Sequence, residues 1–313
     1  MKLLVFARNY TNYVSRNGMY YLLTELEKIT DLVTWQDKGD DIHKILRQLD
    51  IEPDFILVSE YFENNSNKVT GLSKLSIPNA ISLHELHWDI EYRNKLIQSE
   101  NIQHIFSVYR DAFYKWYPKF RSKMRWLPHH VPVDIFKDYG LSKDIDYLLM
   151  GVIDKRYYPL RNMILNKMKD KPGFVNHEHP GYREFIADEN IFVREKYARE
   201  INRAKIFFTC DSILHYPVAK YFEVLACKTL LLAPTSPEIE DLGFIPGVNF
   251  VSIDENDFEE KAKYYLDHEK ERLEIAEQGY EMVRARHSTV QRAAELVAMI
   301  EDILRSRQPN STQ

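Results

Sequence analysis

The residues with the clearest chemical potential surround the start of one expected helix. Pro217 suits the first turn of that helix, where its missing N–H is not needed. A helix that begins at about Val218 and Ala219 offers free backbone N–H groups to an anion. Lys220 in the same turn favours a diphosphate, and Glu223, one turn further on, is placed to accept hydrogen bonds from ribose hydroxyls. A surface Lys–Glu pair on an ordinary helix explains the same spacing equally well.

A second basic segment follows an apolar strand candidate at residues 147–150. Gly151 allows the chain to turn sharply beneath a ligand. Lys155, Arg156 and Arg161 place positive charge where a pyrophosphate would lie. We prefer Arg161 as the contact, because it lies in the first turn of the next expected helix, as Lys220 does. A solvated basic loop is the alternative interpretation.

Histidine and acidic side chains gather directly after the strand candidate at residues 80–83. The segment contains His84, Glu85, His87 and Asp89. Because the pKa of an unperturbed histidine lies near neutrality, His87 could move a proton or orient a hydroxyl, with Glu85 beside it. A lone histidine is usually structural, but four such residues at a strand end favour a catalytic role, for which we rank His87 ahead of His84.

His177 and His179 flank Glu178, which raises the question of a metal site. Alternate residues of a strand share a face without converging on one ion. No further His/Cys cluster follows, so we predict no metal and interpret the segment that ends at Tyr182 as a ligand-binding loop.

Composition excludes several classes of protein. The 313 residues carry 42 Lys+Arg and 47 Asp+Glu, a net charge of −5, which argues against a general nucleic-acid binder. Cys210 and Cys227 are too few for a disulfide framework or a zinc cluster. The apolar start is too short for a signal peptide, and no apolar run approaches a membrane span. We therefore expect a cytoplasmic protein without a membrane span.

Short apolar strands between amphipathic helices indicate parallel sheets covered on both faces. The pattern breaks near residues 135–145 and then restarts, which predicts two α/β units. Ligands of such sheets bind outside the carboxyl ends of the strands. The expected strands are residues 3–7, 32–35, 55–58, 80–83, 104–108, 147–150, 206–209, 229–233 and 250–253, and the main expected helices are 19–29, 160–169, 219–227, 259–266, 270–285 and 289–305.

The segment around Lys220 resembles the C-terminal domain of GT-B glycosyltransferases, closest to the CgeB-like spore-maturation group. The matching segments are Lys220-Tyr-Phe-Glu-Val-Leu-Ala-Cys, Leu230-Leu-Leu, Pro237-Glu-Ile-Glu-Asp-Leu and Pro246-Gly247, followed by Tyr264-Tyr-Leu-Asp-His and Ile275-Ala-Glu-Gln-Gly279. In the wider family 4, two glutamates spaced eight apart lie at the donor site. Glu223 matches the second, which is associated with the donor ribose, whereas His215 stands in place of the first.

Further segments carry the same resemblance more loosely. Residues 146–151 and 158–161 are similar to the first strand, the glycine turn and the helix start of the family's C-terminal domain. Residues 179–182 resemble a loop of CgeB-like proteins, which implies that Tyr182 lies on the donor side. Glu85 and His87 match an acid-x-His arrangement in the N-terminal domain. Gly18 is the only glycine to support the donor/acceptor loop that GT-B enzymes carry after their first strand.

The resemblance implies an α/β fold of the GT-B type, with two Rossmann-like domains whose parallel sheets face each other across a cleft. We expect an N-terminal acceptor-side domain over residues 1–138 and a nucleotide-sugar-binding domain over 139–288. Residues 289–313 would form a C-terminal helix that crosses back to the first domain, followed by a frayed tail from 308. The implied donor-binding residues are Glu223, Lys220, Ala219, Val218, Arg161, Gly151, Tyr182 and Gly18, and the implied catalytic residues are His87 and Glu85.

The implied reaction is transfer of a sugar from a nucleotide diphosphate sugar, with UDP as the expected nucleotide, to a hydroxyl acceptor such as a surface glycan or another glycoconjugate. GT-B enzymes generally need no metal or other cofactor, and the family 4 likeness implies retention of anomeric configuration. One alternative is a degenerate GT-B protein that binds the nucleotide without turnover, which His215 in place of an acid would allow. A DNA-modifying glucosyltransferase is a further alternative that the net charge disfavours.

Overall fold

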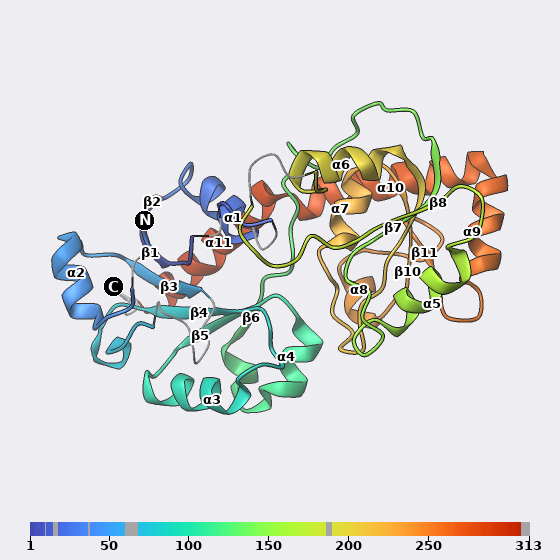
Figure 1. Ribbon diagram of the computed structural model, residues 1–313. Helices are drawn as coiled ribbons and strands as arrows, with labels where there is room; N and C mark the ends of the chain where they lie inside the picture. Colours follow the sequence, from blue (N-terminus) through green and yellow to red (C-terminus); the bar gives the residue numbers. More distant parts are fainter. Residues whose placement is uncertain (10, 15–17, 37, 60–67, 186–189, 308–313) are drawn as a thin grey trace, which may run out of the picture. The chain divides into compact units, whose positions relative to one another are not determined.

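The computed structural model describes residues 1–307 except 10, 15–17, 37, 60–67 and 186–189. The predicted frayed tail at residues 308–313 lies outside the described residues. The chain divides into two compact units (Figure 1). Unit 1 comprises Met1–Thr11, Met19–Pro128 and Arg292–Gln313, and unit 2 comprises Asn12–Gly18 and His129–Gln291.

Unit 1 alternates strands with helices along the chain. Its short 3-10 helices are residues Leu72–Lys74 and Pro118–Lys123. Its strands are β1 (Lys2–Phe6), β2 (Asp31–Trp35), β3 (Phe55–Ser59), β4 (Asn79–Leu83), β5 (His104–Ser107) and β6 (Met124–Trp126). Its helices are α1 (Gly18–Leu26), α2 (Ile42–Leu49), α3 (Ile90–Ser99), α4 (Arg110–Trp116) and the greater part of α11 (Thr289–Arg307).

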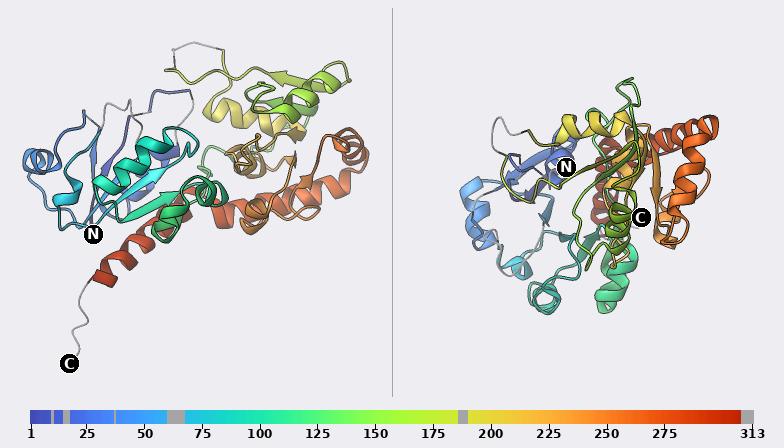
Figure 2. Two further views of the ribbon diagram at one scale, coloured as in Figure 1. Left: turned by 90° about the horizontal axis from the view of Figure 1, so that it is seen from below. Right: turned by 45° about the vertical axis from the view of Figure 1, so that its right-hand side comes forward.

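The strands of unit 1 form one parallel sheet in the order β2-β1-β3-β4-β5-β6. Every residue of β3 is buried, which fits a strand covered on both faces. One face of the sheet packs on α1 and on α11, which runs alongside the strands (Figure 2). Leu296 and Ile300 of α11 are fully buried against Leu3 and Leu57 of the sheet.

Unit 2 repeats the same alternation. Its strands are β7 (Ile145–Met150), β8 (Phe174–His177), β9 (Ala204–Phe208), β10 (Leu230–Ala233) and β11 (Val251–Ser252). Its helices are α5 (Pro159–Met168), α6 (Arg194–Arg203), α7 (Lys220–Ala226), α8 (Pro237–Asp241), α9 (Phe258–Asp267) and α10 (Glu269–His287).

The sheet of unit 2 is also parallel, in the order β11-β10-β9-β7-β8. Strand β7 starts the unit and lies between β8 and β9, so the strand order reverses direction between β7 and β9. Such a switch point, at the carboxyl ends of the strands, is where open α/β sheets bind their ligands. The segments that follow β7 and β9 are therefore the ones that form a binding site.

The expected elements agree with this architecture. All nine predicted strands occur, and the sequence missed β6 and β8. The helix expected from about Val218 begins at Lys220 instead. Among the helices that the structure describes, none is long and apolar enough to cross a membrane.

Candidate functional site

Three of the predicted binding residues meet at the switch point of unit 2. Gly151 follows β7 with a φ of +133°, a conformation that residues with side chains rarely adopt. A Cβ added to Gly151 would lie 3.0 Å from Nη1 of Arg161 and 3.0 Å from Cε of Lys220. The missing side chain therefore lets the two cationic side chains approach the same point of the backbone.

Arg161 spans the carboxyl ends of β7 and β9. Its Nη1 donates to the carbonyl of Val152 at 2.9 Å, and its Nη2 donates to Oγ1 of Thr209 at 3.1 Å and to the carbonyl of Cys210 at 3.2 Å. The side chain is buried, and its Nε has no hydrogen-bond partner among the described atoms. The guanidinium carbon Cζ of Arg161 lies 4.1 Å from the centroid of the Tyr158 ring. Arg161 is thus held by neutral groups, none of which neutralises its charge.

Lys220 adds a second positive charge to this point. Burial lowers the pKa of Lys220 and the charge of Arg161 lowers it further, while Glu223 opposes both effects. Within the part of the chain that the structure describes, neither Lys220 nor Arg161 has a carboxylate within ion-pair distance. Two cations without such a counter-ion in one partly buried place are suited to an anion, and we call this place the anion site.

Glu223 lies one turn further along α7 and is half-buried. The hydroxyl of Tyr197, on α6, donates to Oε2 of Glu223 at 3.2 Å. Burial raises the pKa of the Glu223 carboxyl, whereas the Lys220 charge and the Tyr197 hydrogen bond oppose the rise. The carboxylate is therefore oriented from one side and can still accept hydrogen bonds from a ligand.

Val218 and Ala219 form the turn that leads into α7. The carbonyl of Val218 accepts from the N–H of Tyr221, and the carbonyl of Ala219 accepts from the N–H groups of Phe222 and Glu223. These bonds begin the helical pattern before Lys220 and place Val218 and Ala219 beside the Lys220 side chain in sequence. Both residues are partly exposed.

The loop after β8 contains the predicted residue Tyr182, whose side chain is 57% exposed. Its ring lies 4.9 Å from the ring of His179. His177, at the end of β8, instead bonds Glu200 through Nε2 at 2.7 Å. The two histidines therefore have separate surroundings, and among the described residues no group of three or more His, Cys, Asp and Glu is placed to hold a metal ion.

His215, which replaces the expected first acid, lies beside an acid that the spacing did not reveal. Its Nδ1 is 2.9 Å from Oδ2 of Asp211, a buried residue just after β9. Burial raises the pKa of Asp211, and the hydrogen bond from His215 opposes the rise. Both residues line a pocket of about 490 Å³ at the carboxyl ends of β9, β10 and β11. Cys210 lines the same pocket, and its carbonyl accepts the Arg161 hydrogen bond, so the pocket adjoins the anion site.

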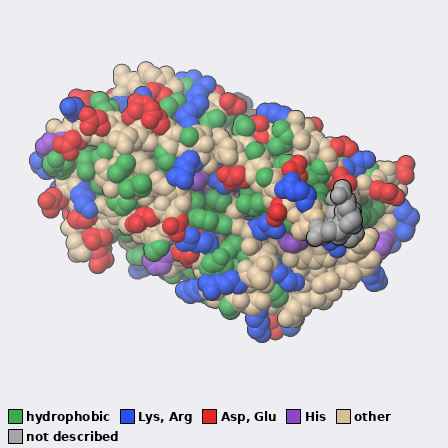
Figure 3. Space-filling model, turned by 180° about the vertical axis from the view of Figure 1, so that it is seen from behind, with side chains coloured by type: hydrophobic (Ala, Val, Ile, Leu, Met, Phe, Trp, Pro, Cys, Tyr) green, Lys and Arg blue, Asp and Glu red, His purple; other side chains and the backbone are tan. Residues whose placement is uncertain are grey.

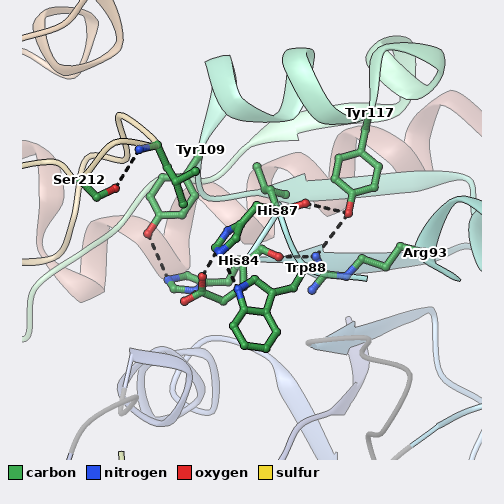
Figure 4. A network of polar contacts seen from close by, with 10 residues as sticks. His84, His87, Trp88, Arg93, Tyr109, Tyr117 and Ser212 are labelled. Atoms are coloured by element: carbon green, nitrogen blue, oxygen red, sulfur yellow. Dashed lines mark hydrogen bonds and ion pairs between the residues drawn. The ribbon is translucent and has the colours of Figure 1, made fainter. Parts of the chain in front are cut away.

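The predicted catalytic residues lie in unit 1, in the turn after β4 (Figure 4). His87 Nδ1 is 3.8 Å from Oε2 of Glu85, and the indole N–H of Trp88 donates to Nε2 of His87. Burial lowers the pKa of His87, while the charge of Glu85 opposes the effect. His84 Nδ1 is 3.5 Å from the other oxygen of Glu85. Glu85 thus lies between two imidazoles.

Arg93 and Tyr117 lie beside this turn and contact its backbone (Figure 4). Arg93 is fully buried, and its Nη1 donates to the carbonyl of Glu85 at 2.5 Å. The Tyr117 hydroxyl donates to the carbonyl of Leu86 at 3.1 Å and lies 3.3 Å from Nη1 of Arg93. The backbone that carries Glu85 and His87 is therefore anchored to the core of unit 1.

The predicted residues thus divide between the units. Gly151, Arg161 and Lys220 come together in unit 2, with Glu223 on the next turn of the same helix, whereas Glu85 and His87 form a separate group in unit 1. Gly18, the first residue of α1, gives no geometric reason for a glycine, because an added Cβ would meet nothing within 4 Å.

Sequence reasoning missed Thr209, Tyr197 and Asp211. Thr209 and Asp211 come directly after β9, and a position after a strand was a signal that the sequence offered. Tyr197 lies on α6 and contacts Glu223, which is 26 residues away in the sequence, so no spacing could reveal it.

Residues 161–298 match the family described as glycosyl transferase-like, a segment that starts at Arg161 and includes Lys220 and Glu223. No curated protein matches the chain at a significant level.

Solved structures match nearly the whole chain. A glycosyltransferase from Rickettsia africae is similar over 98% of this chain and 99% of its own, with 10% identity and a TM-score of 0.65. HepE from Anabaena, solved with UDP-glucose, is similar over 96% and 100%, with 10% identity and a TM-score of 0.66. Sucrose-phosphate synthase from Thermosynechococcus elongatus is similar over 97% and 99%, with 11% identity and a TM-score of 0.66. The fold is GT-B. Both GT-B domains are the predicted Rossmann-like units with parallel sheets.

Proposed function

We propose that this GT-B protein is a glycosyltransferase that uses a nucleotide diphosphate sugar, with UDP as the expected nucleotide. The observation that carries the proposal is the approach of Arg161 and Lys220 to Gly151 at the switch point of unit 2. Two positive charges match the two negative charges of a diphosphate diester. The match of residues 161–298 to a glycosyl transferase-like family covers this cluster and supports the same conclusion.

We assign the ribose and the sugar of the donor to residues on either side of the two cations. Glu223, oriented by Tyr197, accepts hydrogen bonds from the ribose hydroxyls. The pocket beside Arg161 offers room for the sugar, where Asp211 and His215 provide polar contacts. HepE, which has the same fold, was solved with UDP-glucose. We assign Val218, Ala219 and Tyr182 to the edges of this donor site.

The chemical task of the cluster is to stabilise the leaving diphosphate. As the bond from the anomeric carbon to the phosphate oxygen breaks, negative charge grows on the diphosphate, and fixed positive groups in a partly buried site lower the energy of that state. Arg161 and Lys220 supply this stabilisation without a metal ion. We expect activity to survive EDTA, and a complete loss that Mg²⁺ or Mn²⁺ restores would contradict this part of the proposal.

His87 and Glu85 are assigned to the acceptor hydroxyl. The lowered pKa of His87 keeps the ring neutral near pH 7, and its Nε2 can take the proton of an attacking hydroxyl once that hydroxyl displaces the exposed indole N–H of Trp88. Retention of configuration, the CgeB-like specificity, a glycoconjugate acceptor and a cytoplasmic location stay predictions of the sequence resemblance.

The first experiment is thermal stabilisation by UDP, GDP, ADP, TDP and CMP. A ligand that binds only the folded state stabilises it by RT ln(1 + [L]/Kd), about 2.7 kcal/mol at 100 times Kd. We expect one diphosphate to raise the Tm of the wild type and to have no effect on Lys220→Ala or Glu223→Ala. Lys228→Ala is the matched control, because Lys228 instead pairs with Glu277.

Two other functions predict different results. A degenerate binder would be stabilised by the nucleotide but would release no free diphosphate from the intact donor. A DNA-modifying enzyme would bind duplex DNA in a salt-dependent way. On the face shown in Figure 3, basic and acidic side chains are interspersed, which does not favour such binding. No stabilisation by any nucleotide would contradict the proposed donor site.

A further inference from the structure

His179 lies in the loop that follows β8, next to β7 in the sheet of unit 2. The ring is partly buried, and the charges that act on it are those of Lys220 on α7 and Arg161 on α5. Tyr182 covers the ring from the same loop at 4.9 Å. A third side chain with a polar ring therefore accompanies the two cations of the anion site, and none of the functions assigned above uses it.

One hydrogen bond fixes the tautomer of His179. The backbone N–H of Gly181 donates to Nδ1 at 3.0 Å, so Nδ1 is the acceptor and carries no proton. A neutral imidazole then carries its proton on Nε2. Among the described residues no group bonds Nε2 of His179. The ring thus keeps one N–H for a ligand.

The surroundings of His179 also fix its charge. Burial, together with the charges of Lys220 and Arg161, lowers the pKa of the ring to about 4. Near pH 7 the ring is neutral, because two nearby cations oppose a third. An anion bound between Lys220 and Arg161 therefore meets a histidine that donates a hydrogen bond without adding charge.

We propose that His179 is a binding residue of the donor site, whose Nε2–H donates as a neutral group to a diphosphate oxygen held by Arg161 and Lys220. This inference rests on the proposed function, since it assigns a third contact to the same diphosphate. In this tautomer neither ring nitrogen of His179 offers a free lone pair, because Nδ1 accepts from Gly181 and Nε2 carries the proton.

Two substitutions of His179 test the roles of its two ring nitrogen atoms separately. The amide of glutamine reaches about as far as Nε2, so His179→Gln keeps a donor for the diphosphate. The amide of asparagine reaches only as far as Nδ1, so His179→Asn can accept from Gly181 and preserve the loop but has no group for the ligand. We expect His179→Asn to weaken UDP-glucose binding about 10- to 100-fold, since a hydrogen bond to a charged group is lost, and His179→Gln to stay within a few-fold of the wild type.

Calorimetric titration with UDP-glucose measures this difference. UDP-glucose is the suitable probe because its diphosphate diester does not titrate near neutral pH. Equal affinity of His179→Asn and wild type would overturn the inference while leaving the proposed function intact. Absence of binding by the wild type would instead overturn the proposed function. Because His179→Gln lacks the acceptor for Gly181, loss of affinity in both variants contradicts the role of Nε2–H where the Tm of His179→Gln equals that of the wild type.

The charge state has its own measurement. We expect the ratio of wild-type to His179→Gln affinity for UDP-glucose to be constant between pH 6.0 and 7.5, because a neutral ring does not titrate there and the other titratable groups of the site, Lys220, Glu223, Asp211 and His215, are the same in both proteins. A histidine with the ordinary pKa of about 6.5 would lose most of its charge over this window, so this ratio would fall as pH rises. An NMR titration of His179 in the free protein tests the same point without a ligand, and a pKa near 6.5 would overturn the inference.

Discussion

Gly151 lies where a side chain would come within 3.0 Å of both Arg161 and Lys220. In Gly151→Ala the methyl group must push one of these cations away, and the φ of +133° adds backbone strain of about 1–3 kcal/mol. We expect the variant to lose the stabilisation by UDP that we expect of the wild type, measured by differential scanning fluorimetry. Gly140→Ala is the control, since Gly140 also has a positive φ, of +64°, but its new methyl group meets nothing within 4 Å. A full response to UDP in Gly151→Ala would show that the close approach is not needed.

Trp88 helps to keep the ring of His87 neutral. Its indole N–H donates to Nε2 of His87, which favours the neutral ring, while burial is the main cause of the lowered pKa. Trp88→Phe removes this hydrogen bond, so we expect the pKa of His87 to rise toward its ordinary value. An NMR titration of the histidine rings measures the change. His104, whose pKa of about 4 results from its own burial and from Arg125, is the internal control and is expected not to move.

The sequence could reveal some of the residues of the candidate site but not others. Lys220 and Glu223 were readable because one helix holds both at a fixed spacing, and Gly151 because it ends an apolar run. Nothing in the spacing showed that Tyr197 would meet Glu223 or that His179 would feel the charges of Lys220 and Arg161. Such contacts depend on how three strands bring their loops to one edge of the sheet.

At the scale of elements, the turn after β4 depends on groups that α3 and the segment after α4 supply. Tyr117→Phe removes the hydroxyl that donates to the carbonyl of Leu86, which leaves a buried carbonyl without that partner. We expect a loss of about 1–3 kcal/mol in the free energy of unfolding, measured in urea. Tyr114→Phe is the control, because its ring contacts Arg121 in a partly exposed place. Equal stability of the two variants would contradict the supporting role of Tyr117.

Elements with a strong apolar pattern were predicted and weaker ones were missed. Strand β3 has five buried residues and stood out, whereas β8 at the edge of its sheet has only partly buried residues and carries Asn176 and His177. Helix α6 was missed because its ten residues are mostly charged, with few buried apolar side chains such as Ala198 and Ile201. Edge strands and polar helices bury few apolar side chains, so they leave no clear hydrophobic pattern in the sequence.

At the scale of the whole molecule, buried histidines link stability to pH. The pKa values of His104 and His179 are lowered to about 4 in the folded protein, mainly by burial, and return to about 6.5 on unfolding. The unfolded chain therefore binds more protons between these values, so the free energy of unfolding falls as the pH drops from about 6.5 to about 4. Urea unfolding at several pH values measures the slope. We expect His104→Gln to flatten the slope and His268→Gln, an exposed position, to leave it unchanged.

Helix α11 contributes fully buried side chains to the core of unit 1. Ile300→Ala removes part of one of them and is expected to cost about 2–5 kcal/mol of unfolding free energy. Val290→Ala, at a position 58% exposed near the start of the same helix, is expected to change stability by less than about 0.5 kcal/mol. A small effect of Ile300→Ala in urea unfolding would show that the core closes without the helix.

Helix α11 also affects the order in which the two units can fold during synthesis. Domains usually fold as they emerge from the ribosome, the N-terminal one first. Here the core of unit 1 contains β1 from the start of the chain and Ala293, Leu296, Ile300 and Ile303 from its end. Unit 1 therefore has to wait with an apolar face uncovered until α11 has been translated, and all the strands of unit 2 are translated before that helix. The unit whose strands are made first completes its core only after those of the second unit have been made.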